Sequence, residues 1–200
     1  MDTPYTPRAT QRLVEWLRTR YGKRPLVAVS SHFHWDALGG NAALLGAGAA
    51  VWGSDETARL LQEREEAMRS QMKEALGGDA RFAPFADLRA LPPSHRFSLE
   101  KGTFMRFGKD GVRVLHPGPG HSPDNVVVHF EDLGVIFGGC MILGGDRVAS
   151  RSDADLARWP DAVHAVKELP GEIVIPGHGD RTDRGLLDHT LSVLARTPQS

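Results

Sequence analysis

The sequence predicts an α/β fold built from layered sheets and helices. Two observations indicate this fold class. In the first part of the chain, helices alternate with short apolar strands, and the last part repeats that alternation. In the middle, apolar runs separated by turn residues predict paired antiparallel strands. These runs lie at residues 104–107, 112–115, 126–130 and 135–137.

The first helix is expected over residues 10–21, with Leu13, Trp16 and Leu17 on one face of an amphipathic pattern. The apolar run 26–29 then suits a buried strand. A helix of small residues and a second strand follow, over residues 41–48 and 49–52.

A long charged helix is predicted next. Ser54 can cap it, Asp55 is favoured in its first turn by the helix dipole, and it is expected to reach about Leu76. Its second half belongs to a helical and loop insertion over 63–99, in which residues 79–96 are rich in proline. After the hairpins, helix, strand and helix are expected over residues 154–169, 173–175 and 184–195.

Composition excludes several classes of protein. The chain has 200 residues, 40% of them hydrophobic, with 24 Lys and Arg against 25 Asp and Glu. Cys140 is the single cysteine, so no disulfide can form within the chain. A net charge of −1 without a long basic run argues against nucleic acid as a partner. No apolar run approaches the ~20 residues that a membrane-spanning helix needs.

One motif carries metal-binding chemistry. His32 and His34 directly follow a predicted strand, and their i, i+2 spacing lets both side chains reach one metal ion. Asp36 comes two residues later and offers a carboxylate oxygen to a neighbouring ion. The alternative is a surface loop in which this spacing occurs by chance.

Three further residues follow predicted strands in the same way. His121, Cys140 and His178 lie in glycine-rich segments, each just beyond an apolar run. Taken singly, such a histidine is more often a hydrogen-bonded loop residue, and such a cysteine a small buried hydrophobe. Together, ligands at strand ends meet at one edge of a sheet. The six residues make two zinc sites of three protein ligands each, the open pattern of catalytic zinc.

The sequence resembles the metallo-β-lactamases, specifically the dizinc subclass with a three-histidine site and an Asp-Cys-His site. The matching segments are SHFHWDALGGN, HPGPGHSPDNVVV, IFGGCMI and IVIPGHGDRTDRGLLDHTL. The resemblance implies a single domain over residues 1–200 with an αββα sandwich fold. It also implies two Zn²⁺ per chain. The wider superfamily has a histidine directly after the motif aspartate, where this chain has Ala37, and this difference favours the β-lactamase branch.

Carried over by position, the resemblance assigns two zinc sites. His32, His34 and His121 would hold the first zinc. Asp36, Cys140 and His178 would hold the second.

The resemblance implies hydrolysis of the β-lactam amide bond by zinc-bound hydroxide, and hence antibiotic resistance. Asp36 would also be catalytic by orienting the attacking water. Arg147 would bind the substrate carboxylate, because the family's usual lysine position holds Leu143. Trp35 could line the substrate pocket or simply pack. The expected partner is a small-molecule β-lactam, bound by a monomer, with no nucleic acid and no membrane.

Two alternative functions stay open: a hydrolase of the same fold acting on a lactone or thioester, and an inactive zinc-binding fragment. Family members carry several strands before a segment like Asp2-Thr3-Pro4, so we expect this chain to be shortened at its N-terminus and to lack the opening strands of the first sheet. A full-length member would be periplasmic or secreted, and this chain shows no signal peptide.

The five other histidines have no predicted ligand role. His95 and His164 are expected to be exposed, and His129 to lie on a strand face. His116 and His189 flank the site segments and could support the ligands.

Overall fold

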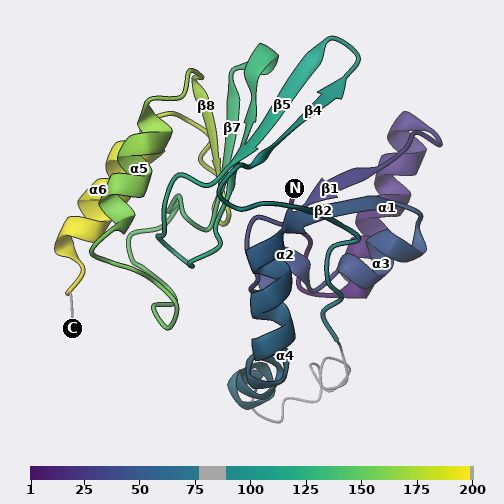
Figure 1. Cartoon of the computed structure of the whole chain (residues 1–200), viewed down its shortest axis with the longest axis horizontal. Coiled ribbons are helices and arrows are strands. Elements are labelled where there is room, and N and C mark those ends of the chain that lie inside the picture. Colours follow the sequence, from purple (N-terminus) through teal and green to yellow (C-terminus); the bar gives the residue numbers. More distant parts are fainter. Residues whose placement is uncertain (77–88, 199–200) are drawn as a thin grey trace. The chain divides into compact units, whose positions relative to one another are not determined.

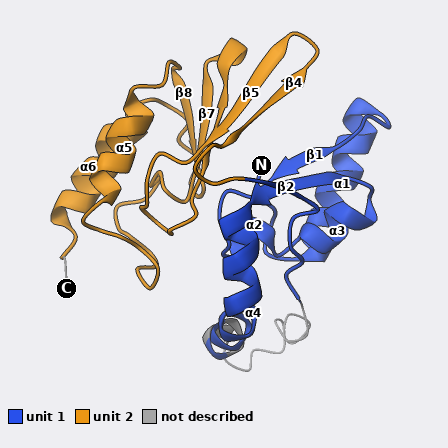
Figure 2. Cartoon of the chain, in the orientation of Figure 1, with its two compact units in different colours: residues 1–97 blue, residues 98–200 orange. Residues whose placement is uncertain are grey.

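The structure, a computed structural model, describes residues 1–76 and 89–198. It divides into two compact units, Met1–Phe97 and Ser98–Ser200 (Figure 2). The single domain expected over residues 1–200 remains a prediction. In the described residues, no helix is both long enough and apolar enough to span a membrane.

The first unit contains a three-stranded parallel sheet in the order β1-β2-β3, of which β1 and β2 are labelled in Figure 1. Its strands are β1 (Val27–Val29), β2 (Ala50–Ser54) and β3 (His95–Phe97). Its helices are α1 (Pro7–Tyr21), α2 (Trp35–Leu38), α3 (Asn41–Gly46) and α4 (Asp55–Leu76). Because the strands are parallel, the loops that leave their carboxyl ends lie along one edge of the sheet.

Helix α1 forms where it was predicted, but its buried face differs from the predicted one. Val14 and Thr10 are buried, and Val14 packs in a small core with Val51 of β2. Leu13 and Trp16 are exposed at 38% and 57%. Among the described residues, Thr10 and Val14 form the buried side of this helix, and two of the apolar residues on the predicted face lie outside it.

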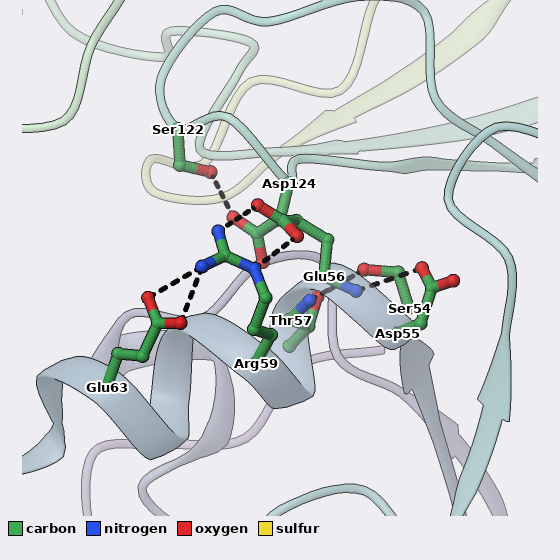
Figure 3. A network of polar contacts seen from close by, with 8 residues as sticks. All are labelled: Ser54, Asp55, Glu56, Thr57, Arg59, Glu63, Ser122 and Asp124. Atoms are coloured by element: carbon green, nitrogen blue, oxygen red, sulfur yellow. Dashed lines mark hydrogen bonds and ion pairs between the residues drawn. The ribbon is translucent and has the colours of Figure 1, made fainter.

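The N-terminus of α4 is capped as predicted. The Ser54 hydroxyl accepts a hydrogen bond from the Thr57 N–H at 2.8 Å (Figure 3). One turn later, the Arg59 guanidinium donates to the carboxylates of Glu56 and Glu63, each at 2.6 Å. These contacts support a helix whose side chains are mostly solvated.

Part of the predicted insertion over 63–99 lies outside the described residues, at 77–88. The described remainder corrects one expectation. His95–Phe97 forms strand β3, although residues 79–96 were expected to be loop-rich. The segment has no apolar run, and it becomes a strand only because it pairs with β2, with Trp52 opposite His95. The two rings stack with centroids 4.8 Å apart.

The second unit contains a five-stranded sheet in the order β4-β5-β6-β7-β8. Its strands are β4 (Thr103–Phe107), β5 (Asp110–Leu115), β6 (Val127–Phe130), β7 (Val135–Gly139) and β8 (Ile173–Pro176), and its helices are η2 (Glu131–Leu133), α5 (Trp159–Lys167) and α6 (Leu186–Arg196). Neighbouring strands are antiparallel except β7 and β8, which are parallel. Strands β5, β7 and β8 therefore run in the same direction and end at the same edge.

Helices α5 and α6 pack together on this sheet (Figure 1). Trp159, Ile136, Val174 and Leu186 are fully buried in their shared core. Helix α5 begins at Trp159, later than the predicted residue 154, because Pro160 occupies its first turn, where a missing backbone N–H costs nothing.

Candidate metal centre

The loop after β1 brings three predicted ligands of the first unit together. The rings of His32 and His34 lie with their centroids 4.8 Å apart. His32 Nε2 is 3.4 Å from the Asp36 carboxylate. An imidazole nitrogen and a carboxylate oxygen, both common zinc ligands, therefore lie side by side. His32 is almost completely buried, at 1% exposed.

The Asp2 side chain supports this loop through Ser31. One carboxylate oxygen of Asp2 accepts the Ser31 N–H and the other accepts the Ser31 hydroxyl, both at 2.7 Å. The Ser31 oxygen in turn lies 3.0 Å from His32 Nδ1. Burial raises the pKa of the Asp2 carboxyl, although the hydrogen bonds from Ser31 act in the opposite direction. Sequence reasoning assigned no role to Asp2 or Ser31.

The residues that follow Asp2 hold the other end of the same loop. The Thr3 hydroxyl accepts the Gly40 N–H at 2.8 Å and donates to the Ala37 carbonyl at 3.3 Å. A Cβ on Gly40 would lie 1.9 Å from the Thr10 hydroxyl oxygen, so the close approach requires glycine. We call residues 2–5 the N-terminal strap, because they bind this loop at both ends.

Trp35, predicted to pack or to line a pocket, lies in a small core of the first unit. Trp35 is buried, at 5% exposed, and packs with Leu38 and Leu61. Its indole N–H donates to the Tyr5 carbonyl of the strap at 2.8 Å. This placement favours the packing role and adds a third attachment between strap and loop.

In the second unit, Cys140 and His178 follow two adjacent parallel strands. Gly139 of β7 pairs with Pro176 of β8, and the Gly177 N–H donates to the Gly139 carbonyl at 2.7 Å. A Cβ on Gly177 would lie 2.7 Å from the Cys140 sulfur. The strand pairing therefore places the thiol directly beside the segment that carries His178.

His121 lies in the loop between β5 and β6, at the same edge of the sheet. Its ring meets that of Trp159 edge-on, with centroids 5.8 Å apart. Beyond it, the buried Ser122 hydroxyl donates to the Asp124 carboxylate at 2.8 Å (Figure 3). The Asn125 side chain closes the loop by donating to the Gly118 carbonyl at 2.9 Å. These contacts hold a backbone that has little regular structure.

The remaining histidines behave largely as expected. His95 and His164 are exposed, and His129 is buried on β6. His116 Nδ1 lies 2.7 Å from the Asn125 carbonyl, and His189 Nε2 lies 3.0 Å from the Gly145 carbonyl.

Comparison with known proteins identifies the family. Residues 6–178 match the metallo-beta-lactamase superfamily. The chain belongs to the metallo-β-lactamase superfamily. Among curated relatives, it is 28% identical over 198 residues to metallo-beta-lactamase type 2 of Bacillus cereus, covering 97% of this chain and 67% of that protein. It is 25% identical to the type 2 enzyme of Elizabethkingia meningoseptica, covering 100% of this chain and 71% of that protein.

Solved structures of metallo-β-lactamases share the fold. The enzyme from Pontibacter korlensis has a TM-score of 0.80 at 30% identity, covering 98% of this chain and 81% of its own. The enzyme from Hirschia baltica has a TM-score of 0.77 at 27% identity, covering 96% and 78%. The DIM-1 metallo-β-lactamase exposed to ceftazidime has a TM-score of 0.75 at 28% identity, covering 97% and 78%. The predicted fold class and family are therefore confirmed.

Membership of this superfamily makes the chain a metallohydrolase, and its donor set suits a metal. Imidazole nitrogen, thiolate sulfur and a carboxylate oxygen are the ligands that zinc prefers. The predicted ligands of the first unit follow β1, and those of the second unit follow β5, β7 and β8, which end at one edge of their sheet. Within the first unit, His32 Nε2 and the Asp36 carboxylate lie 3.4 Å apart, so two donor types are close together.

Proposed function

We propose that this chain is a zinc hydrolase that opens the amide bond of β-lactams. The observation that carries the proposal is a set of six donors that follow the ends of strands, on loops or, for Asp36, in the first turn of α2: His32, His34, Asp36, His121, Cys140 and His178. A second support is that the relatives reported above are named metallo-β-lactamases.

The proposed zinc sites follow the ligand types. His32, His34 and His121 would hold the first zinc. Asp36, Cys140 and His178 would hold the second, where a thiolate is the softest ligand of the set. Bound zinc lowers the pKa of a water toward ~7 and polarises a carbonyl.

The chain's own residues would then orient the reactants. Asp36 orients the attacking water, whose oxygen forms the new bond to the lactam carbonyl carbon. The C–N bond breaks, and the ring nitrogen takes up a proton. Arg147 is exposed on the loop after Cys140, where its guanidinium is available to pair with the substrate carboxylate. We assign Cys140 a ligand role and not that of a nucleophile.

The test is hydrolysis by zinc-loaded protein of a carbapenem, a lactone and a thioester in parallel, together with metal content by mass spectrometry. We expect two zincs per chain and turnover of the carbapenem. Substitution of His34 or His178 by Ala should abolish turnover, whereas the matched variants His95→Ala and His164→Ala, at exposed histidines, should retain it.

Each contrary outcome has its own meaning. Turnover of only the lactone or thioester would replace β-lactam with that substrate class. Two zincs per chain without hydrolysis of any substrate would identify a zinc-binding protein without catalytic activity. If the His34→Ala and His178→Ala variants bind as much zinc as the unaltered protein, these residues are not zinc ligands.

A further inference from the structure

Side chains of helices α5 and α6 hold the segment that carries Arg147. This segment, residues 141–148, begins directly after Cys140. Three contacts hold its backbone. The Trp159 indole N–H donates to the Met141 carbonyl at 2.8 Å, the Leu143 N–H donates to the Thr190 hydroxyl oxygen at 3.0 Å, and His189 Nε2 lies 3.0 Å from the Gly145 carbonyl.

Thr190, which accepts the Leu143 N–H, is a polar residue in the core of the second unit. It is fully buried on α6, and its hydroxyl donates to the Leu186 carbonyl at 2.7 Å. The same oxygen accepts the Leu143 N–H, so both capacities of the hydroxyl are used. The hydrogen bond to Leu143 joins α6 to a loop 47 residues earlier in the chain. It adds nothing to the hydrogen bonding within the helix, so it serves to hold the loop.

The segment has two further contacts, one against His178 and one at Val148, which follows Arg147. A Cβ on Gly144 would lie 2.2 Å from the His178 carbonyl, so the segment passes directly against that residue. Val148, just after Arg147, packs against the core of the second unit. Arg147 therefore extends from a short span whose backbone is held on both sides.

We propose that Thr190 and His189 are positioning residues for substrate recognition. By holding residues 141–148, they keep Arg147 where it meets the substrate carboxylate. This inference rests on the proposed function and extends it to two residues of α6. Because Arg147 would bind the substrate and take no part in the chemical step, loss of its positioning should raise KM and leave kcat nearly unchanged.

The test compares three variants of the full chain. Thr190→Val removes the acceptor of the Leu143 N–H, and Thr190→Ser retains it. Thr197→Val is the control. The Thr197 hydroxyl, at the C-cap of α6, also donates to a carbonyl one turn earlier, at 2.9 Å, but this contact is local and does not reach residues 141–148. Hydrogen exchange at the Leu143 amide reads the contact without any need for activity.

We expect Thr190→Val to speed exchange at Leu143 about tenfold or more and to raise KM for a carbapenem by about tenfold, with kcat within about twofold. Thr190→Ser should restore both values, and Thr197→Val should change neither. Zinc content should be the same in all of them.

His189→Ala is a second variant in case Thr190→Val does not fold. It should raise KM in the same way and speed tryptic cleavage after the exposed Arg147, whereas His164→Ala on α5 should do neither. If hydrogen exchange at Leu143 and tryptic cleavage after Arg147 are unchanged in these variants, Thr190 and His189 do not hold the segment. If exchange is faster but KM is unchanged, they hold the segment without positioning Arg147 for the substrate. If the unaltered protein hydrolyses no β-lactam, the proposed function is wrong. The role of this segment in recognising a β-lactam is then wrong as well, whatever the exchange at Leu143 shows.

Discussion

Asp2 binds Ser31 through both of its carboxylate oxygens, each at 2.7 Å from its donor. Because the Ser31 hydroxyl gives its proton to Asp2, its oxygen is left to accept one from His32 Nδ1, 3.0 Å away. A neutral histidine that donates from Nδ1 has its lone pair at Nε2. This relationship therefore directs Nε2 of His32 to act as the metal ligand.

Replacing Asp2 should weaken both the fold and zinc binding. Asp2→Ala leaves the Ser31 N–H and hydroxyl without their acceptor, which should lower the free energy of unfolding by about 1–3 kcal/mol. Loss of such a supporting contact should reduce zinc affinity by roughly 10–100-fold. Urea unfolding and competition with a chelator measure the two effects. Glu100→Ala, at an exposed acid, is the control, and equal zinc affinities in the two variants would contradict the prediction.

Alanine at Gly40 should destabilise the loop that carries His32, His34 and Asp36. Its Cβ would lie 1.9 Å from the Thr10 hydroxyl oxygen, and overpacking of this kind costs about 1–3 kcal/mol. Gly46→Ala is the matched control, since no atom lies within 4 Å of a Cβ there and α3 should gain about 0.5–1 kcal/mol. Urea unfolding should move the two variants in opposite directions. A shift of the same sign in both would argue against the close approach.

A side chain at Gly177 should disturb the Cys140 thiol. The Cβ of Gly177→Ala would lie 2.6 Å from the Cys140 backbone nitrogen and 2.7 Å from its sulfur. We expect loss of one of the two proposed zincs per chain, measured by mass spectrometry of the native protein. Gly145→Ala, where nothing lies within 4 Å, should keep both. Full zinc content in Gly177→Ala would show that the thiol is not a ligand.

Cobalt substitution should report on Cys140 directly. A thiolate bound to Co²⁺ gives an intense near-ultraviolet charge-transfer band, which neither serine nor histidine ligands produce. We expect this band in the cobalt-loaded protein and its complete loss in Cys140→Ser. His129→Asn, at a buried histidine with no proposed ligand role, should keep the band. A band that survives in Cys140→Ser would exclude the assignment, because no other cysteine exists in the chain.

The acidic cluster around Arg59 should make a small, pH-dependent contribution to α4 (Figure 3). The hydrogen bond from Arg59 lowers the pKa of Glu56. A carboxyl whose pKa is lowered by folding adds stability above its unfolded pKa and loses it as the pH falls through the folded value. Glu56→Gln should therefore lower Tm slightly at pH 7, and this effect should fade as the pH falls below the ordinary pKa of Glu, about 4.3, and through the lower folded value. Glu66→Gln is the control, because the Glu66 carboxylate is 3.9 Å from the Arg69 guanidinium, and it should change Tm less at either pH. A loss of Tm in Glu56→Gln that grows on acidification would contradict the stabilising role of the Glu56–Arg59 contact.

Local patterns predicted much of the fold. The cap at Ser54, the hairpin of β4 and β5, and the placement of all six proposed ligands after strands follow from short segments of sequence. Hydrophobic period and turn chemistry act over a few residues, so they can be read without knowing what each segment touches.

Other features depended on contacts between distant segments. Strand β3 exists because β2 is beside it, and Trp16 is exposed because α1 buries a narrower strip than its pattern indicates. The sequence by itself determined the α/β class, the family resemblance and the donor types at the strand ends. Only the tertiary structure decided that Asp2 holds Ser31, 29 residues away, and that Thr190 holds Leu143, because hydrogen bonds between distant segments leave no periodic pattern in the chain.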